Sequence, residues 1–159
     1  MKNKTVVSFI QFIISFIATC YLILVSLLIR KKRKVVVFGS APIIDYKYWT
    51  EALRSKGIPA KSLMKGLYSI NSANDFDLFF DDLIPFKSRL KLINEIQYLF
   101  FVWPYIIANA KYVVTNFNGF VFKRFFWKTE HVLFKLNRIK VIHLAYGSDA
   151  FIYSKICDK

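Results

Sequence analysis

The chain has 159 residues, a formal net charge of +14, a hydrophobic fraction of 55% and an aromatic fraction of 18%. This aromatic and hydrophobic content excludes a disordered chain, and only 5 Gly and 4 Pro exclude collagen-like and linker sequences. The length allows one domain with an appendage and excludes two full-sized domains.

The first long segment of the chain is uncharged. Residues 5–29, TVVSFIQFIISFIATCYLILVSLLI, follow a short tail of residues 1–4. A helix of this length measures about 37 Å at about 1.5 Å per residue, which is enough to cross a hydrocarbon core of about 30 Å. A cleaved signal peptide has a shorter apolar region that ends in a small-residue cleavage site, and the sequence has neither feature. We therefore expect a transmembrane helix over residues 5–29.

A polybasic segment, residues 30–34, follows directly. Its five cations exceed the two lysines, Lys2 and Lys4, on the other flank of the apolar segment. The excess predicts a single-pass protein of the inner (cytoplasmic) membrane with its soluble domain in the cytoplasm. Cations beside such a helix contact lipid phosphate, so a nucleic-acid partner is not expected. The segment consists of Arg30, Lys31, Lys32, Arg33 and Lys34.

The soluble part begins with a βαβ pattern. Residues 35–38 are a short apolar run that ends at a glycine, as in a buried strand. Asp45 is placed to cap a helix that ends near Gly57, and residues 60–64 form a second predicted strand. We expect the apolar face of this helix to contain Tyr48, Trp49, Ala52 and Leu53.

Helices and strands continue to alternate downstream. We expect a short strand within residues 76–80, a long helix over 90–110 interrupted by Pro104, a strand over 112–116, helical stretches within 120–138 and a strand over 139–145. The uncharged stretch 98–110 is too short to cross a membrane and is interpreted as a core helix. The alternation predicts an α/β, Rossmann-like fold over residues 35–159, with a mostly parallel sheet and flanking helices.

No metal site is expected. Cys20 lies in the apolar segment and Cys157 near the end of the chain, and His131 and His143 are isolated from each other and from the cysteines. The spacing of these residues is therefore not that of a zinc site or of a disulfide framework. No cofactor is expected for this chain alone.

Two turns follow predicted strands, where ligands bind in parallel α/β sheets. The first contains Gly39, Ser40, Ala41 and Pro42, which provide a tight turn, a hydroxyl and a helix start that can face an anion. An ordinary turn between strand and helix explains it equally well. The second is the stretch 147–149, in which Asp149 can cap a helix, accept from a sugar hydroxyl or act as a base, and capping alone is the favoured interpretation.

Three stretches together resemble the N-terminal half of GT-B glycosyltransferases that build bacterial surface polysaccharides. They are KVVVFGSAP, PIIDYKYWTEALRSKGIPAKSLM and VIHLAYGSDAF, and the resemblance covers residues 34 to about 155. In that family the N-terminal domain binds the acceptor, while the C-terminal domain makes most of the nucleotide-sugar contacts. The resemblance therefore implies a membrane-anchored transferase of envelope polysaccharide synthesis, with a lipid-linked or glycan acceptor.

The resemblance also implies roles for individual residues. The turn 39–42 would line the interdomain cleft near the donor phosphates. Asn116 and Asn118 are candidates to bind sugar hydroxyls, and the second turn would lie on the same rim, near the reacting sugar. Asp149 is the candidate catalytic residue. The second turn consists of Gly147, Ser148 and Asp149.

The sequence departs from the family because it stops ten residues after Asp149. A donor-binding domain, and with it a nucleotide-sugar donor, would have to come from a longer reading frame or from a second transferase subunit. We favour a truncated chain, which would be inactive without the second domain. The alternative function is a non-catalytic membrane-anchoring subunit that recruits a separate soluble glycosyltransferase.

A basic, aromatic segment, FNGFVFKRFFWK at residues 117–128, is a candidate membrane surface. Its rings suit the acyl boundary and its cations suit lipid phosphate, where a lipid-linked acceptor would be presented. The competing interpretation, which we slightly favour, places the aromatic rings in the core and the cations in solvent. The candidate residues are Lys123, Arg124, Trp127 and Lys128.

Overall fold

The computed structural model describes residues 2–29, 34–116, 119–121 and 127–144. The described strands form one five-stranded sheet with the order β3-β2-β1-β4-β5, and every pair is parallel. The α/β, Rossmann-like fold predicted from the sequence is therefore confirmed. The strands are β1 (Val35–Phe38), β2 (Ala60–Met64), β3 (Leu78–Phe79), β4 (Ala110–Thr115) and β5 (Lys140–His143).

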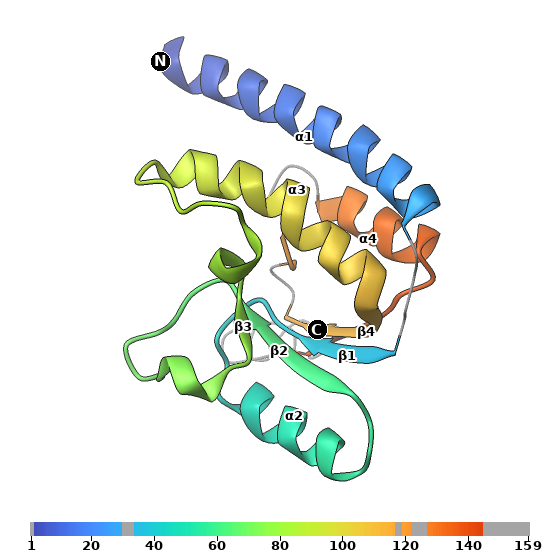
Figure 1. The fold of residues 1–159 in the computed structure, drawn as a ribbon. Helices are drawn as coiled ribbons and strands as arrows, with labels where there is room; N and C mark the ends of the chain where they lie inside the picture. Colours follow the sequence, from blue (N-terminus) through green and yellow to red (C-terminus); the bar gives the residue numbers. More distant parts are fainter. Residues whose placement is uncertain (1, 30–33, 117–118, 122–126, 145–159) are drawn as a thin grey trace, which may run out of the picture.

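The helices cover both faces of the sheet (Figure 1). Helix α2 lies on one face, α3 and α4 lie on the other, and α1 lies outside α3 and α4. The bounds are α1 (Lys2–Leu28), α2 (Asp45–Ser55), α3 (Lys91–Asn109) and α4 (Trp127–Leu136), with short 3₁₀ turns η1 (Ala73–Asp75) and η2 (Phe80–Leu83).

Strand β1 occupies the centre of the sheet, where the direction of strand order changes. Its register pairs Val37 with Lys61 of β2 on one side and with Val113 of β4 on the other. The chain leaves β1 through α2 toward β2, and it returns through α3 to β4 on the opposite side. In such sheets the carboxyl ends of the central strands border a crevice, which is where ligands bind.

Helix α3 is a core helix. Trp103, Ile106 and Ile107 are fully buried, which confirms the interpretation of the uncharged stretch 98–110. The helix continues through Pro104 without the predicted interruption. Its buried side chains pack with Val37 and Val113 of the sheet in one cluster.

The predicted apolar face of α2 is correct only in part, because Leu53 packs against the core and Trp49 contacts Phe38 of β1. Tyr48 and Trp49 are 58% and 38% exposed, whereas Tyr46 and Thr50 are buried. Tyr46 and Trp49 both contact Phe38 of β1, at 5.5 and 6.2 Å between ring centroids. The face that packs on the sheet therefore keeps Trp49 and Leu53 but contains Tyr46 and Thr50 in place of Tyr48 and Ala52. Thr50 tolerates burial because its hydroxyl donates to the Tyr46 carbonyl at 2.6 Å.

The predicted end of α2 is confirmed. Gly57 has φ +74° and its N–H donates to the Arg54 carbonyl at 2.9 Å. This left-handed conformation closes the helix at little cost only for glycine. The chain can then turn directly into β2.

Helix α1 includes the apolar segment 5–29 except its last residue. Its residues Ala18 and Leu22 are fully buried, and the helix contacts α3 and α4. Within the described part of the chain, no helix meets the length and hydropathy that a membrane crossing requires.

An ion pair joins α2, β2 and the segment before β3. One carboxylate oxygen of Asp77 lies 2.7 Å from an Arg54 guanidinium nitrogen and accepts from the Ser62 N–H at 2.8 Å and the Ser62 hydroxyl at 3.0 Å. Burial acts to raise the pKa of Asp77, but the hydrogen bonds from Arg54 and Ser62 outweigh it and hold the pKa below its usual range.

Replacing Asp77 with asparagine is expected to lower the free energy of unfolding by about 1–2 kcal/mol at neutral pH, because a neutral amide keeps an acceptor oxygen but not the ion pair with Arg54. A depressed folded-state pKa contributes stability above the unfolded-state pKa, and this stability is lost as the pH falls through the folded-state pKa. The difference in free energy of unfolding between the parent protein and the Asp77→Asn variant should therefore shrink toward zero in acid. Urea titrations across this pH range measure it, and a difference that persists in acid would contradict the assignment.

Candidate functional site

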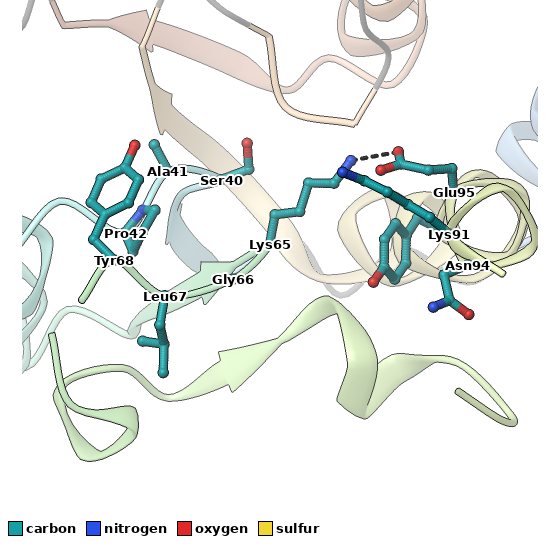
Figure 2. Close-up of a pocket in the computed structure, with 11 residues that line it drawn as sticks. Ser40, Ala41, Pro42, Lys65, Gly66, Leu67, Tyr68, Lys91, Asn94 and Glu95 are labelled. Atoms are coloured by element: carbon teal, nitrogen blue, oxygen red, sulfur yellow. Dashed lines mark hydrogen bonds and ion pairs between the residues drawn. The ribbon is translucent and has the colours of Figure 1, made fainter. Parts of the chain in front are cut away.

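A cavity of about 410 Å³ lies at the carboxyl ends of β1 and β2 (Figure 2). The turn after β1, the turn after β2 and the first turns of α3 form its walls. Its volume is in the range of about 300–1,000 Å³ typical of small-molecule sites. The lining residues are Ser40, Ala41, Pro42, Lys65, Gly66, Leu67, Tyr68, Lys91, Asn94, Glu95 and Tyr98.

The turn after β1 is held by both neighbouring strands. The Gly39 N–H donates to the Val114 carbonyl at 3.0 Å, and the Ser40 carbonyl accepts from the Lys65 N–H at 2.9 Å. The peptide bond between Gly39 and Ser40 is cis. A Cβ on Gly39 would lie 2.2 Å from the Leu63 carbonyl oxygen and 2.8 Å from the Phe120 ring. Only glycine allows the backbone at position 39 to approach β2 this closely, and this close approach places Ser40 on the cavity wall.

An ion pair crosses the cavity. The Lys65 ammonium lies 2.5 Å from a carboxylate oxygen of Glu95, and Figure 2 shows the Lys65 side chain extending toward α3 to make this contact. The same ammonium lies 5.3 Å from the centroid of the Tyr98 ring. Lys65 is therefore oriented by two groups of α3, and it joins the turn after β2 to that helix.

Tyr98 is itself oriented by a hydrogen bond to Asp81 of η2. The Tyr98 hydroxyl donates to one oxygen of Asp81, and the Lys87 ammonium pairs with the other. Burial and the hydrogen bond to Asp81 raise the pKa of Tyr98. Burial opposes the shift at Asp81, but Lys87 and Tyr98 still lower the pKa of this carboxyl. Tyr98 therefore stays a neutral hydrogen-bond donor, and its ring is a rigid wall for the site.

The first turns of α3 supply a second cation. Lys91 precedes Glu95 by four residues, so both side chains lie on the same face of the helix (Figure 2). The Asn94 amide is already hydrogen-bonded to Ser88: it accepts from the Ser88 N–H at 2.8 Å and donates to the Ser88 carbonyl at 2.9 Å. Two ammonium groups, one carboxylate and the Ser40 hydroxyl suit a ligand that carries both phosphate and hydroxyl groups. Among the described residues, no group of acids, histidines and cysteines is arranged to hold a metal ion.

The loop after β4 is positioned by a buried acid that sequence analysis did not identify. Glu130 of α4 is 4% exposed, and its carboxylate accepts from the Phe120 N–H at 2.9 and 3.0 Å and from the Val121 N–H at 2.7 Å. Gly119, immediately before these residues, has φ +79°, and its carbonyl accepts from the Ser40 hydroxyl at 3.4 Å. Glu130 therefore supports the Ser40 turn from behind.

The structure places part of the predicted site in the cavity. Ser40, Ala41 and Pro42 line it, and Gly39 lies directly behind them. Asn116 follows β4 as predicted but is 8% exposed and does not line the cavity. Its carbonyl lies 3.4 Å from Nδ1 of His143.

The remaining predicted residues do not line the cavity or lie outside the part of the chain that the structure describes. Lys34 is exposed, and the side chains of Trp127 and Lys128 at the start of α4 are not described. The following lie outside the described residues: Arg30, Lys31, Lys32, Arg33, Asn118, Lys123, Arg124, Gly147, Ser148 and Asp149.

Sequence analysis also missed the charged residues of the cavity. Lys65 comes immediately after β2, so the rule that selected the turn after β1 would have selected this turn as well. The spacing of Lys91 and Glu95 indicates a shared helix face, but only the folded chain brings that face to the turns after β1 and β2.

Comparisons of the chain with protein-family models, with curated proteins and with solved structures give no match in any of the three.

Proposed function

We propose that the chain is the acceptor-binding half of a membrane-attached GT-B glycosyltransferase. In this proposal the complete enzyme transfers a sugar from a nucleotide-sugar to a lipid-linked or glycan acceptor during surface polysaccharide synthesis. The donor-binding domain comes from further sequence or from a second subunit. Asp149 remains the candidate catalytic residue.

The observation that carries the proposal is the position of the cavity. It lies at the carboxyl ends of β1 and β2, and three residues of the turn that resembles the GT-B family line it. Its charged groups suit a phosphorylated sugar: Lys91 and Lys65 can contact phosphate, and Glu95 can accept from a sugar hydroxyl. The ring of Tyr68, which is more than half exposed, offers a surface for a sugar ring.

Membrane attachment is a second part of the proposal. It is supported by the uncharged residues 5–29 followed by the five cations at 30–34. Attachment would bring the cavity to a lipid-linked acceptor at the cytoplasmic surface of the inner membrane.

A binding experiment tests the site. The full chain in detergent is titrated with a panel of short-chain prenyl-pyrophosphoryl monosaccharides, and saturation-transfer NMR follows binding. At least one member should bind, and Lys91→Met should weaken its binding roughly tenfold because one charge-assisted contact to phosphate is lost. Lys91→Arg, which retains the charge, should bind more tightly than Lys91→Met.

The matched control is Lys61→Met. Lys61 is an exposed lysine of β2 outside the cavity, so its replacement removes the same charge without touching the ligand. Equal weakening by Lys61→Met and Lys91→Met would indicate a nonspecific charge effect and contradict the site. If no member of the panel binds, the acceptor-binding function is wrong, and the alternative of a non-catalytic anchoring subunit is favoured.

A further inference from the structure

Helix α1 has two distinct apolar faces. The inner face, which includes Ala18, Leu22 and Ser26, is buried. Tyr21 at its edge packs against Phe100 of α3, with ring centroids 5.1 Å apart and the ring planes tilted by 44°. The outer face is exposed and consists of large apolar side chains, namely Phe12, Ile13, Phe16, Ile17, Ile23, Leu24, Leu27 and Leu28.

A buried hydrogen bond holds the inner face on the domain. Asn137, directly after α4, is fully buried and donates to the Ser26 hydroxyl and to the Leu133 carbonyl, both at 2.8 Å. The Ser26 hydroxyl donates to the Leu22 carbonyl at 2.6 Å. Separating α1 from the domain would leave the Asn137 amide without its partner on α1, and it would expose Leu22 to water. The last three turns of α1 therefore belong to the folded domain.

The outer face has the chemistry of a surface that lies on an anionic bilayer. It contains no charged residue, and the chain continues directly into the five cations at 30–34. An exposed apolar helix face bordered by cations inserts its side chains at the boundary of headgroups and acyl chains, where the cations meet lipid phosphate. This charge complementarity favours an anionic bilayer over a second copy of α1, because residues 1–34 contain no acidic residue to pair with these cations.

We propose that α1 lies along the membrane surface with its outer face in the lipid and the domain attached to its inner face. Figure 1 shows α1 alongside α3, with both helices running in the same direction, and α1 contacts α3 and α4. A crossing orientation of the docked helix would carry charged residues of these helices, such as Lys91 and Glu95, toward hydrocarbon, where charged side chains are costly. The inference rests on the membrane attachment included in the proposed function but not on sugar transfer.

Three labelled positions on the outer face distinguish the two orientations. Cys20 is exposed, and Ile13 and Leu27 lie seven residues to either side on the same face, at 41% and 70% exposure. Residues 13 and 27 are about 21 Å apart along a helix axis. All three proteins carry Cys157→Ser. In the first, a nitroxide is attached to Cys20. In the other two, which also carry Cys20→Ser, it is attached to a cysteine introduced by Ile13→Cys or by Leu27→Cys. Depth is measured by power saturation in vesicles of phosphatidylcholine and phosphatidylglycerol.

Equal depths of about 5–10 Å at all three positions are expected for a helix in the interface. A label at Glu51→Cys is the control and should remain in water, because Glu51 is exposed and α2 lies on the face of the sheet opposite α1 (Figure 1). A steady change in depth from residue 13 to residue 27 in vesicle-bound protein would overturn the inference while leaving membrane attachment intact. Absence of vesicle binding would overturn both the interfacial orientation and membrane attachment. A dimer in which a second copy covers the outer face would overturn them as well, and light scattering would detect it.

Discussion

Gly39→Ala is expected to lower the free energy of unfolding by about 3 kcal/mol, the upper end of the usual cost of overpacking. The added Cβ would lie 2.2 Å from the Leu63 carbonyl oxygen, which is a backbone atom of β2 and cannot rotate away. β1 and β2 must therefore separate at the edge of the cavity. Urea titration followed by tryptophan fluorescence measures the loss, and the ligand titration described above should show weaker binding.

The matched control is Gly66→Ala. Gly66 also lines the cavity, but a Cβ there would meet no atom within 4 Å. This variant should unfold within about 0.5 kcal/mol of the parent protein. Similar losses at both glycines would show that the close approach of the strands at Gly39 is not the cause.

Glu130→Ala is expected to lower the free energy of unfolding by about 3–4 kcal/mol. The change removes the acceptor of two buried backbone N–H groups, those of Phe120 and Val121, and each unpaired donor costs about 1–3 kcal/mol. Because the same loop contacts Ser40 through the Gly119 carbonyl, ligand binding should weaken as well. Chemical denaturation and the same ligand titration measure the two effects.

Glu130→Gln provides a graded comparison. The amide retains one acceptor oxygen, so its cost should lie between those of the parent and the alanine variant, at about 2 kcal/mol. Glu51→Ala, which removes an exposed carboxylate from α2, should cost less than about 0.5 kcal/mol. A Glu130→Ala protein as stable as the parent would show that the loop does not depend on the carboxylate.

The strands and the long helix were predictable because their signals are local. The β-branched run at 35–38 predicts a strand and the glycine at position 57 predicts a helix end, and the structure has both. The face of α2 was not predictable in the same way. The prediction includes Trp49 and Leu53 correctly but misses Tyr46, which is buried through its contact with Phe38 in another element.

The residues of the site also differ in whether a local sequence pattern identifies them. The turn at 39–42 was identified because it directly follows a recognisable strand. Lys91 and Glu95 enter the cavity from a helix that begins about fifty residues later in the sequence, and no local pattern indicates that approach. Glu130 was missed because its partners are backbone N–H groups, which leave no mark on the sequence.

The hydrogen bond between Ser26 and Asn137 also sets an order of events during synthesis. The two residues are 111 positions apart, so the inner face of α1 lacks part of its cover until Asn137 has been made. At about 5–20 residues per second, this interval is on the order of ten seconds. Until then, the outer face and part of the inner face of α1 are available to other partners, such as chaperones. Under the proposed membrane attachment, α1 therefore has time to reach lipid before its buried contact with Asn137 can form.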